Sequence, residues 1–291
     1  MRGVYGIATV LCGLAIGAAL PQSRAADNNA IPQFGPDLRT GWIAGVPDSM
    51  DPLGDDFLPP PSGPGPVTSD PAHPYIDNQY ANRMGIQPTL HVADLNSPIL
   101  LPWAREELRK VNERVLKGEP VFTPKERCWP IGVPGWMLYP ATPVYFLQTP
   151  KVVTLIWQED HMVRHVYMNE QHPANVKPTW FGHSVGHYEN GDTLVIDTVG
   201  IETRTFVDQF RTPHTDKLHV VERYRLIEGG KAIEAIATVD DPGAFTAVWR
   251  GMQRYRRVEQ GPMAENVCAE NNDTYFGMKV EPIPTAGKLD F

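Results

Sequence analysis

Two acidic residues stand alone on apolar strand-like segments in the middle of this 291-residue chain. Side-chain alternation places Asp197 on a largely apolar face of residues 193–199 and Glu222 on a largely apolar face of residues 218–226. A buried carboxylate is costly unless it is paired, and incomplete pairing raises its pKa into the range useful for proton transfer. Both are therefore candidate acid–base residues, and the alternative for each is an internal salt bridge. The arginines considered as salt-bridge partners are Arg204, Arg223, Arg250 and Arg254.

Histidines close to these acids are the second half of such a site. His183 and His214 are candidate general acids or bases, because imidazole exchanges protons near neutral pH. His214 lies in a turn expected at the barrel mouth, where the alternative is a hydrogen bond that caps the loop. His183 and His187 lie four residues apart in a strand, which separates them by about 13 Å and prevents one ion from bridging them. A metal site that joins His183 to His214 or His219 and an acid is an alternative that no spacing demands, so we predict no metal.

Cations and aromatic residues complete the candidate site. Arg204 and Arg223 are candidates for stabilising negative charge that develops during a reaction. Four aromatic residues are candidate lining residues of a cavity for an apolar or aromatic ligand, and core packing is the alternative for each. These residues are Trp180, Phe206, Tyr224 and Trp249.

Several catalytic motifs are absent from the sequence. It contains no nucleophile elbow, phosphate-binding loop, dinucleotide fingerprint or dense cluster of metal ligands. We therefore expect chemistry that needs no cofactor and no covalent intermediate.

The segments that carry these residues have the sequence pattern of β-strands. Eight short apolar segments, separated by turn signals, predict a mainly β domain over residues 144–259: a closed, antiparallel, up-and-down β-barrel with an interior that is filled or holds one small ligand. The expected strands are Val144–Thr149, Val152–Gln158, Met162–Met168, Ser184–Tyr188, Thr193–Val199, Leu218–Ile227, Ala232–Val239 and Thr246–Val258.

Irregular chain surrounds this barrel. Residues 26–88 are rich in proline and glycine and predict an extended arm, either a flexible tail or a segment that wraps over the body or onto a second subunit as a homodimer. Residues 89–143 contain one short amphipathic helix, expected over Leu100–Lys117, and a Trp/Pro-rich loop expected to plug the core. The tail of residues 260–291 is expected to be irregular.

Residues 1–25 have the features of a secretory signal peptide: an early arginine, an uncharged apolar run and a small-x-small ending. No later run reaches the roughly 18 apolar residues of a membrane span. The sequence thus predicts a periplasmic or secreted protein without a membrane span.

Charge and cysteine content agree with a location in the periplasm or outside the cell. Removing residues 1–25 takes away two arginines and no acids, which changes the formal charge from −8 to −10 and argues against a nucleic-acid partner. Cys128 and Cys268 then remain, and an oxidising compartment favours a disulfide between them. Two buried thiols are the alternative.

Motifs in the barrel region resemble a large family of secreted, uncharacterised bacterial proteins. They are PTWFGHSVGHY at 178–188, GDTLVIDTVG at 191–200, PHTDKLHVVER at 213–223 and VDDPGAF at 239–245. The resemblance covers most of the chain after the signal peptide. It implies a lipocalin-like, or calycin-like, barrel and implies no particular activity.

Three functions are compatible with these features of the sequence. The first is a cofactor-free lyase, isomerase or hydrolase that acts on a small apolar or aromatic molecule in the barrel, with His183 or His214 exchanging protons, and with Asp197 or Glu222 orienting that histidine. The second is a binding protein for a hydrophobic molecule, with its acids neutralised by arginines. The third is a structural or assembly protein with a filled barrel.

Overall fold

The computed structural model describes residues 31–45, 56–119, 121–138, 142–259 and 263–268. The expected signal peptide and all of the tail except residues 263–268 lie outside these ranges. Within them, no helix combines the length and apolar character that a membrane crossing requires.

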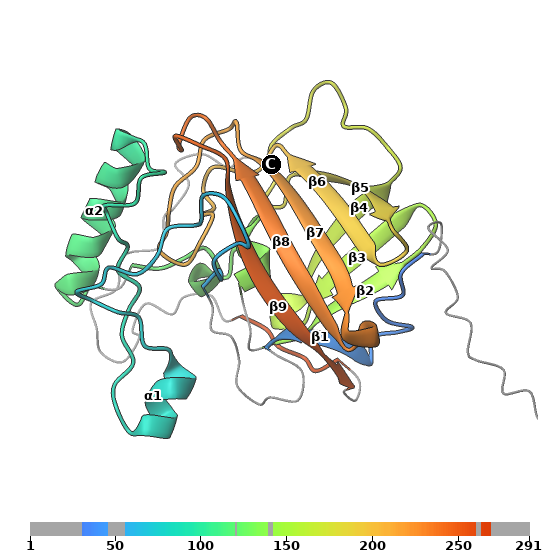
Figure 1. Ribbon diagram of the computed structural model, residues 1–291, viewed down its shortest axis with the longest axis horizontal. Helices are drawn as coiled ribbons and strands as arrows, with labels where there is room; N and C mark the ends of the chain where they lie inside the picture. Colours follow the sequence, from blue (N-terminus) through green and yellow to red (C-terminus); the bar gives the residue numbers. More distant parts are fainter. Residues whose placement is uncertain (1–30, 46–55, 120, 139–141, 260–262, 269–291) are drawn as a thin grey trace, which may run out of the picture.

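Nine strands form one closed barrel, in which neighbours in sequence are neighbours in space and the first strand pairs with the last (Figure 1). The strands are β1 (Thr40–Ala44), β2 (Val144–Gln148), β3 (Val152–Trp157), β4 (Met162–Met168), β5 (His183–Glu189), β6 (Thr193–Val199), β7 (His219–Ile227), β8 (Ala232–Asp240) and β9 (Trp249–Glu259). All eight predicted strands are present, and most of their ends agree to within a residue.

The ninth strand, β1, lies within residues 26–88, which the sequence predicted as an extended arm. It pairs with β9 over five residue pairs and with β2 through Trp42 and Val144, so a part of the arm closes the barrel. The strand has only five residues, and the prolines and glycines around it hide its short pattern.

One pair of strands corrects the simple up-and-down topology. β4 and β5 are parallel, with Val166 opposite Ser184 and Met168 opposite Gly186. The loop of residues 169–182 (yellow-green in Figure 1) brings the chain back, so that β5 starts beside the middle of β4 and runs in the same direction. Turn signals in the sequence marked the ends of both strands, but they did not indicate whether the two strands run parallel or antiparallel.

Large apolar side chains fill the barrel. Trp42, Trp157, Trp249 and Tyr224 are almost completely buried there. The loop between the helical region and β2 was expected to plug the core, and its residues Ile131, Val133, Trp136, Met137 and Leu138 are indeed buried against the barrel residues.

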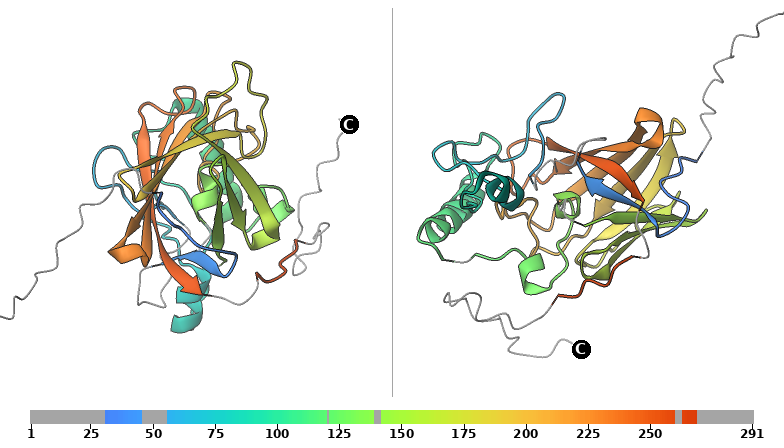
Figure 2. Two further views of the ribbon diagram at one scale, coloured as in Figure 1. Left: turned by 90° about the vertical axis from the view of Figure 1, so that its right-hand side faces the viewer. Right: turned by 90° about the horizontal axis from the view of Figure 1, so that it is seen from below.

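Two helices lie outside the barrel, to one side of it (Figures 1 and 2). The predicted helix is present as α2 (Pro102–Leu116), and a second, unexpected helix, α1 (Asn78–Met84), lies in the arm. From α2, Asn112 binds the backbone N–H and C=O of Ala93 with its side-chain amide. The described ranges also contain four short 3₁₀ helices: Lys125–Arg127, Gly135–Leu138, Glu159–His161 and Glu228–Gly230.

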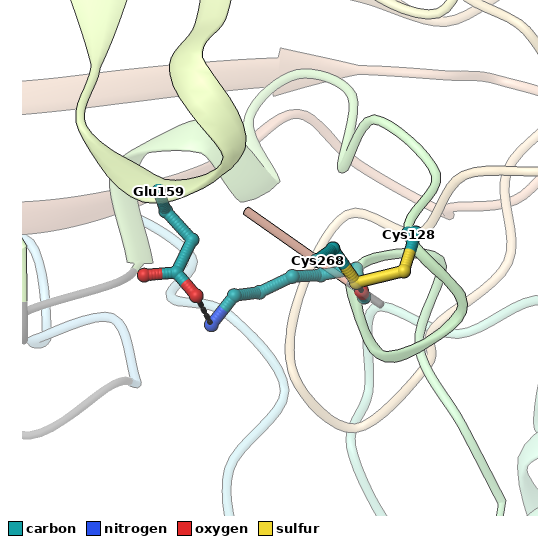
Figure 3. Close-up of a disulfide and its surroundings, with 4 residues drawn as sticks. Cys128, Glu159 and Cys268 are labelled. Carbon is teal, nitrogen blue, oxygen red and sulfur yellow. Dashed lines mark hydrogen bonds and ion pairs between the residues drawn. A yellow bond between two sulfur atoms is a disulfide. The ribbon is translucent and has the colours of Figure 1, made fainter. Parts of the chain in front are cut away.

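Cys128 and Cys268 form the predicted disulfide, with their Cα atoms 5.5 Å apart. Figure 3 shows it near Glu159, which pairs with Lys125 at 3.2 Å and accepts a hydrogen bond from Asn266. The short C-terminal segment is thereby attached to the turn that precedes β4.

The arm also packs against the barrel wall beyond β1. Leu58 exchanges two backbone hydrogen bonds with Met252 of β9, and the neighbouring Phe57 is buried with its ring edge against Trp249. A Cβ atom added to Gly251 would lie 2.6 Å from the Phe57 ring, so glycine allows this close approach.

We expect Gly251→Ala to lower the free energy of unfolding by about 1–3 kcal/mol, because the added methyl group must displace Phe57 from a packed site. Chemical denaturation measures this change. The control is Gly65→Ala, where the new Cβ would make only ordinary contacts and stability should stay within about 0.5 kcal/mol of the wild type. Equal losses in the two variants would contradict the close packing of Phe57.

Candidate functional site

Four polar side chains form a chain of hydrogen bonds on the outside of the barrel. Asp197 Oδ1 lies 3.0 Å from His172 Nε2 and 2.9 Å from His219 Nε2. At the other side of the His172 ring, Nδ1 lies 2.9 Å from His183 Nδ1. We call His183, His172, Asp197 and His219 the outer-wall cluster.

Strand geometry explains why three of these residues meet. His183 on β5 and His219 on β7 flank Asp197 on the intervening strand β6. All three point away from the interior, because the residues that alternate with them are buried. His172 reaches the cluster from the loop of residues 169–182 that connects the parallel strands.

The hydrogen bonds fix which nitrogens carry protons when the histidines are neutral. Carboxylate oxygens only accept, so His172 and His219 each donate from Nε2 to Asp197. His172 Nδ1 is then an acceptor and receives a hydrogen bond from His183 Nδ1–H. The lone pairs that remain for proton uptake are therefore on His183 Nε2 and His219 Nδ1, at the two ends of the cluster.

The cluster is open to solvent while parts of it are shielded. The side chains of Asp197 and His219 are both 40% exposed, and that of His172 is 22% exposed. Burial, and after it the nearby His172, lowers the pKa of His183, whose ring stacks on Tyr167 at a centroid distance of 5.3 Å. His183 is thus held in the neutral form in which it can accept a proton.

Glu222 lies elsewhere, inside the barrel. Its Oε2 is 2.5 Å from Arg164 Nη2, and its Oε1 accepts a hydrogen bond from the Tyr224 hydroxyl at 2.8 Å. Arg164 also donates to Ser184 Oγ and Thr198 Oγ1. Glu222 is therefore in a buried salt bridge, the alternative foreseen for it, but with an arginine that was not among the partners considered.

His214 is also held structurally. It is buried, its Nε2 lies 2.9 Å from Thr205 Oγ1 and its Nδ1 lies 2.9 Å from the Thr215 carbonyl oxygen. Burial lowers its pKa. Both ring nitrogens are thus engaged in bonds within and beside its own loop, as in the loop-capping alternative.

The candidate cations lie apart from the outer-wall hydrogen bonds. The Arg204 guanidinium lies over the Trp180 ring at 4.6 Å and near Trp129, and it pairs with Glu202. Arg223 points outward from β7 and pairs with Glu189 at 2.5 Å. Each cation therefore already has an acidic partner.

The candidate lining residues have different surroundings in the described part of the chain. Tyr224 and Trp249 are part of the packed barrel interior. Phe206 lines a small pocket with a cavity volume of about 10 Å³, room for about one water molecule. The other residues of this pocket are Thr123, Pro124, Ile131, Gly135, Asp208 and Gln209.

Two important residues were missed, for different reasons. Arg164 follows the same alternation as the buried residues of β4, so its inward position could have been derived from the sequence. His172 sits in an irregular loop, and no local pattern indicates that it reaches Asp197.

Comparisons with known proteins add no assignment: no family model, curated protein or solved structure matches the chain. In the ranges that the structure covers, no three His, Cys, Asp or Glu side chains are placed to hold one metal ion.

Proposed function

We propose that this protein is a cofactor-free enzyme that uses general acid–base catalysis on a small apolar or aromatic molecule, in the periplasm or outside the cell. The outer-wall cluster is its proton-transfer site, and the reaction is that of a lyase, isomerase or hydrolase without a covalent intermediate. This assignment moves the reacting groups from the barrel interior to its outer wall.

One observation carries the proposal: a single carboxylate oxygen, Asp197 Oδ1, accepts hydrogen bonds from two histidines. A carboxylate that accepts a hydrogen bond from Nε2–H fixes the ring and the tautomer, and it stabilises the imidazolium formed when the opposite nitrogen takes a proton. His219 gains this support directly, whereas His183 is oriented through its hydrogen bond to His172. The histidine at either end of the cluster can take a proton from a substrate with its free ring nitrogen and return it from the same nitrogen later in the reaction.

We expect Asp197→Asn to lower kcat/KM by about 10²–10⁴-fold, the usual contribution of general acid–base catalysis, while the melting temperature changes little. An amide retains the shape of the carboxylate but cannot stabilise an imidazolium. The assay is a screen of small esters, enol-forming ketones and eliminable aromatic compounds with the wild type, repeated on any hit with the variant.

The matched control is Asp216→Asn, which changes an exposed acid in the loop before β7 and should leave turnover unchanged. Loss of activity in Asp197→Asn that only follows the folded fraction would assign Asp197 to structure and defeat the proposal.

A binding protein for a hydrophobic molecule is the second candidate. The Arg164–Glu222 pair favours it, because neutralised interior acids are what a non-catalytic barrel is expected to contain. Native mass spectrometry of protein purified from its own host separates the two, since a tight binder retains a small organic molecule and an enzyme with weak substrate affinity does not.

A further inference from the structure

Two tryptophans and an arginine form a stacked group beside the start of β5. The ring centroids of Trp129 and Trp180 are 5.5 Å apart, and the rings are tilted by 43°. The Arg204 guanidinium lies over both rings, 4.6 Å from the centroid of Trp180 and 5.8 Å from that of Trp129. The three side chains come from three separate segments of the chain. We call Trp129, Trp180 and Arg204 the stacked-arginine platform.

Backbone hydrogen bonds join the segments that carry Trp180 and Arg204. Thr179, which precedes Trp180, donates its N–H to the Gly200 carbonyl oxygen at 3.0 Å. The Thr179 carbonyl oxygen accepts the N–H of Glu202 at 2.9 Å, two residues before Arg204. The chain thus holds the ring and the guanidinium in place from their backbones, as well as through their contact with each other.

Arg204 has hydrogen-bond donors that the described residues do not use. Its acidic partner is Glu202, whose Oε2 lies 3.3 Å from Nη2, and no described residue accepts a hydrogen bond from Nε or Nη1. The Arg204 side chain is 56% exposed, and an ion pair so open to solvent contributes little. A guanidinium held over aromatic rings keeps its N–H groups available at its edge, where they match the two oxygens of a carboxylate.

The tryptophans add an apolar surface next to these donors. Both Trp129 and Trp180 are partly exposed, and an aromatic ring packs favourably on such side chains. A neutral aromatic molecule would leave the guanidinium donors unused, and an aliphatic anion would make little use of the indole rings. The platform is therefore best matched by a molecule that combines an aromatic ring with a carboxylate.

The platform adjoins one end of the outer-wall cluster. Trp180 precedes His183 by three residues, which limits the separation of their Cα atoms to about 11 Å. Trp180 also lies in the loop of residues 169–182, the loop that carries His172 (Figure 1). The end of the cluster next to the platform is thus the end where His183 Nε2 is free to accept a proton.

We propose that the stacked-arginine platform binds the substrate of the outer-wall reaction, and that this substrate is a small aromatic carboxylate. Arg204 pairs with the carboxylate, and the tryptophans contact the ring beside His183. The role as a substrate site rests on the function proposed above, whereas binding of the anion does not depend on catalysis.

Isothermal titration calorimetry of the full protein tests the platform with two probes, naphthoate and its neutral amide, naphthamide. Naphthoate should bind about tenfold more tightly, because its carboxylate accepts charge-assisted hydrogen bonds from Arg204. Arg204→Gln should remove this preference by weakening naphthoate binding to the level of naphthamide. Trp180→Leu should weaken the binding of both probes by about three- to tenfold.

The matched control is Arg225→Gln, which changes another exposed arginine with one acidic partner, Glu234. Arg225 pairs with Thr193 at the start of β6, whereas the platform lies beyond the end of that strand. The variant should therefore bind both probes as the wild type does.

Three outcomes would overturn the platform: no binding of either probe, equal affinity for the two probes, or a preference for naphthoate that survives in Arg204→Gln. Asp197→Asn separates this inference from the proposed function, because it should bind naphthoate with wild-type affinity. Intact binding without any acid–base turnover would reject the proposed reaction and leave the platform as a binding site. Turnover that depends on Asp197 without naphthoate binding would reject the platform alone.

Discussion

Replacing Glu222 by glutamine is expected to lower the free energy of unfolding by about 3–5 kcal/mol. Glu222 and Arg164 are both almost completely excluded from solvent, and their charged atoms lie 2.5 Å apart. Removing the negative charge leaves the Arg164 guanidinium uncompensated in the barrel interior, and such an uncompensated buried charge is among the most destabilising single changes. Urea denaturation at pH 7 measures the loss.

A double substitution separates the cost of an unpaired charge from the value of the pair. Arg164→Met alone should also lower the free energy of unfolding by about 3–5 kcal/mol, since it leaves the Glu222 carboxylate buried without its partner. Arg164→Met combined with Glu222→Met removes both charges, and its unfolding free energy should lie within about 1–2 kcal/mol of the wild type. A double variant that loses the sum of the single losses would mean that Arg164 and Glu222 contribute independently, and it would contradict their coupling as a buried pair.

The contrast between β1 and the other strands shows which strands a local sequence pattern can predict. Alternation and turn signals predicted β2 to β9 because each strand has one buried face and clear ends. β1 is short, and its place beside β9 is decided by long-range pairing that local patterns do not record. The parallel pairing of β4 and β5 is likewise set by the path of a loop.

The candidate site was predictable to a similar extent. Alternation selected Asp197 and Glu222 as lone acids, but it could not say which face of each strand points inward. The closed barrel turns Glu222 toward Arg164 and turns Asp197 outward toward His219. His183 joins Asp197 only through His172, so the completed cluster depends on a contact between a loop and a strand.

The disulfide is the second place where a large effect is expected. Cys128 and Cys268 are separated by 140 residues, and a crosslink across so long a segment removes much of the conformational freedom of the unfolded chain. The double variant Cys128→Ser with Cys268→Ser should therefore lose about 4–5 kcal/mol of unfolding free energy in the loop-entropy description. Denaturation of the variant, compared with the oxidised wild type, measures the loss.

Local contacts of the tail must be separated from the effect of the crosslink. Asn266→Ala removes only the hydrogen bond to Glu159 and should cost no more than about 1 kcal/mol. Wild-type protein treated with a reductant should unfold like the double serine variant, because both release the same loop. If the serine variant and the Asn266→Ala variant lose similar, small amounts, the bridge serves only to hold residues 263–268 near the turn before β4. A loss several times larger shows that the crosslink acts on the unfolded state of the whole barrel.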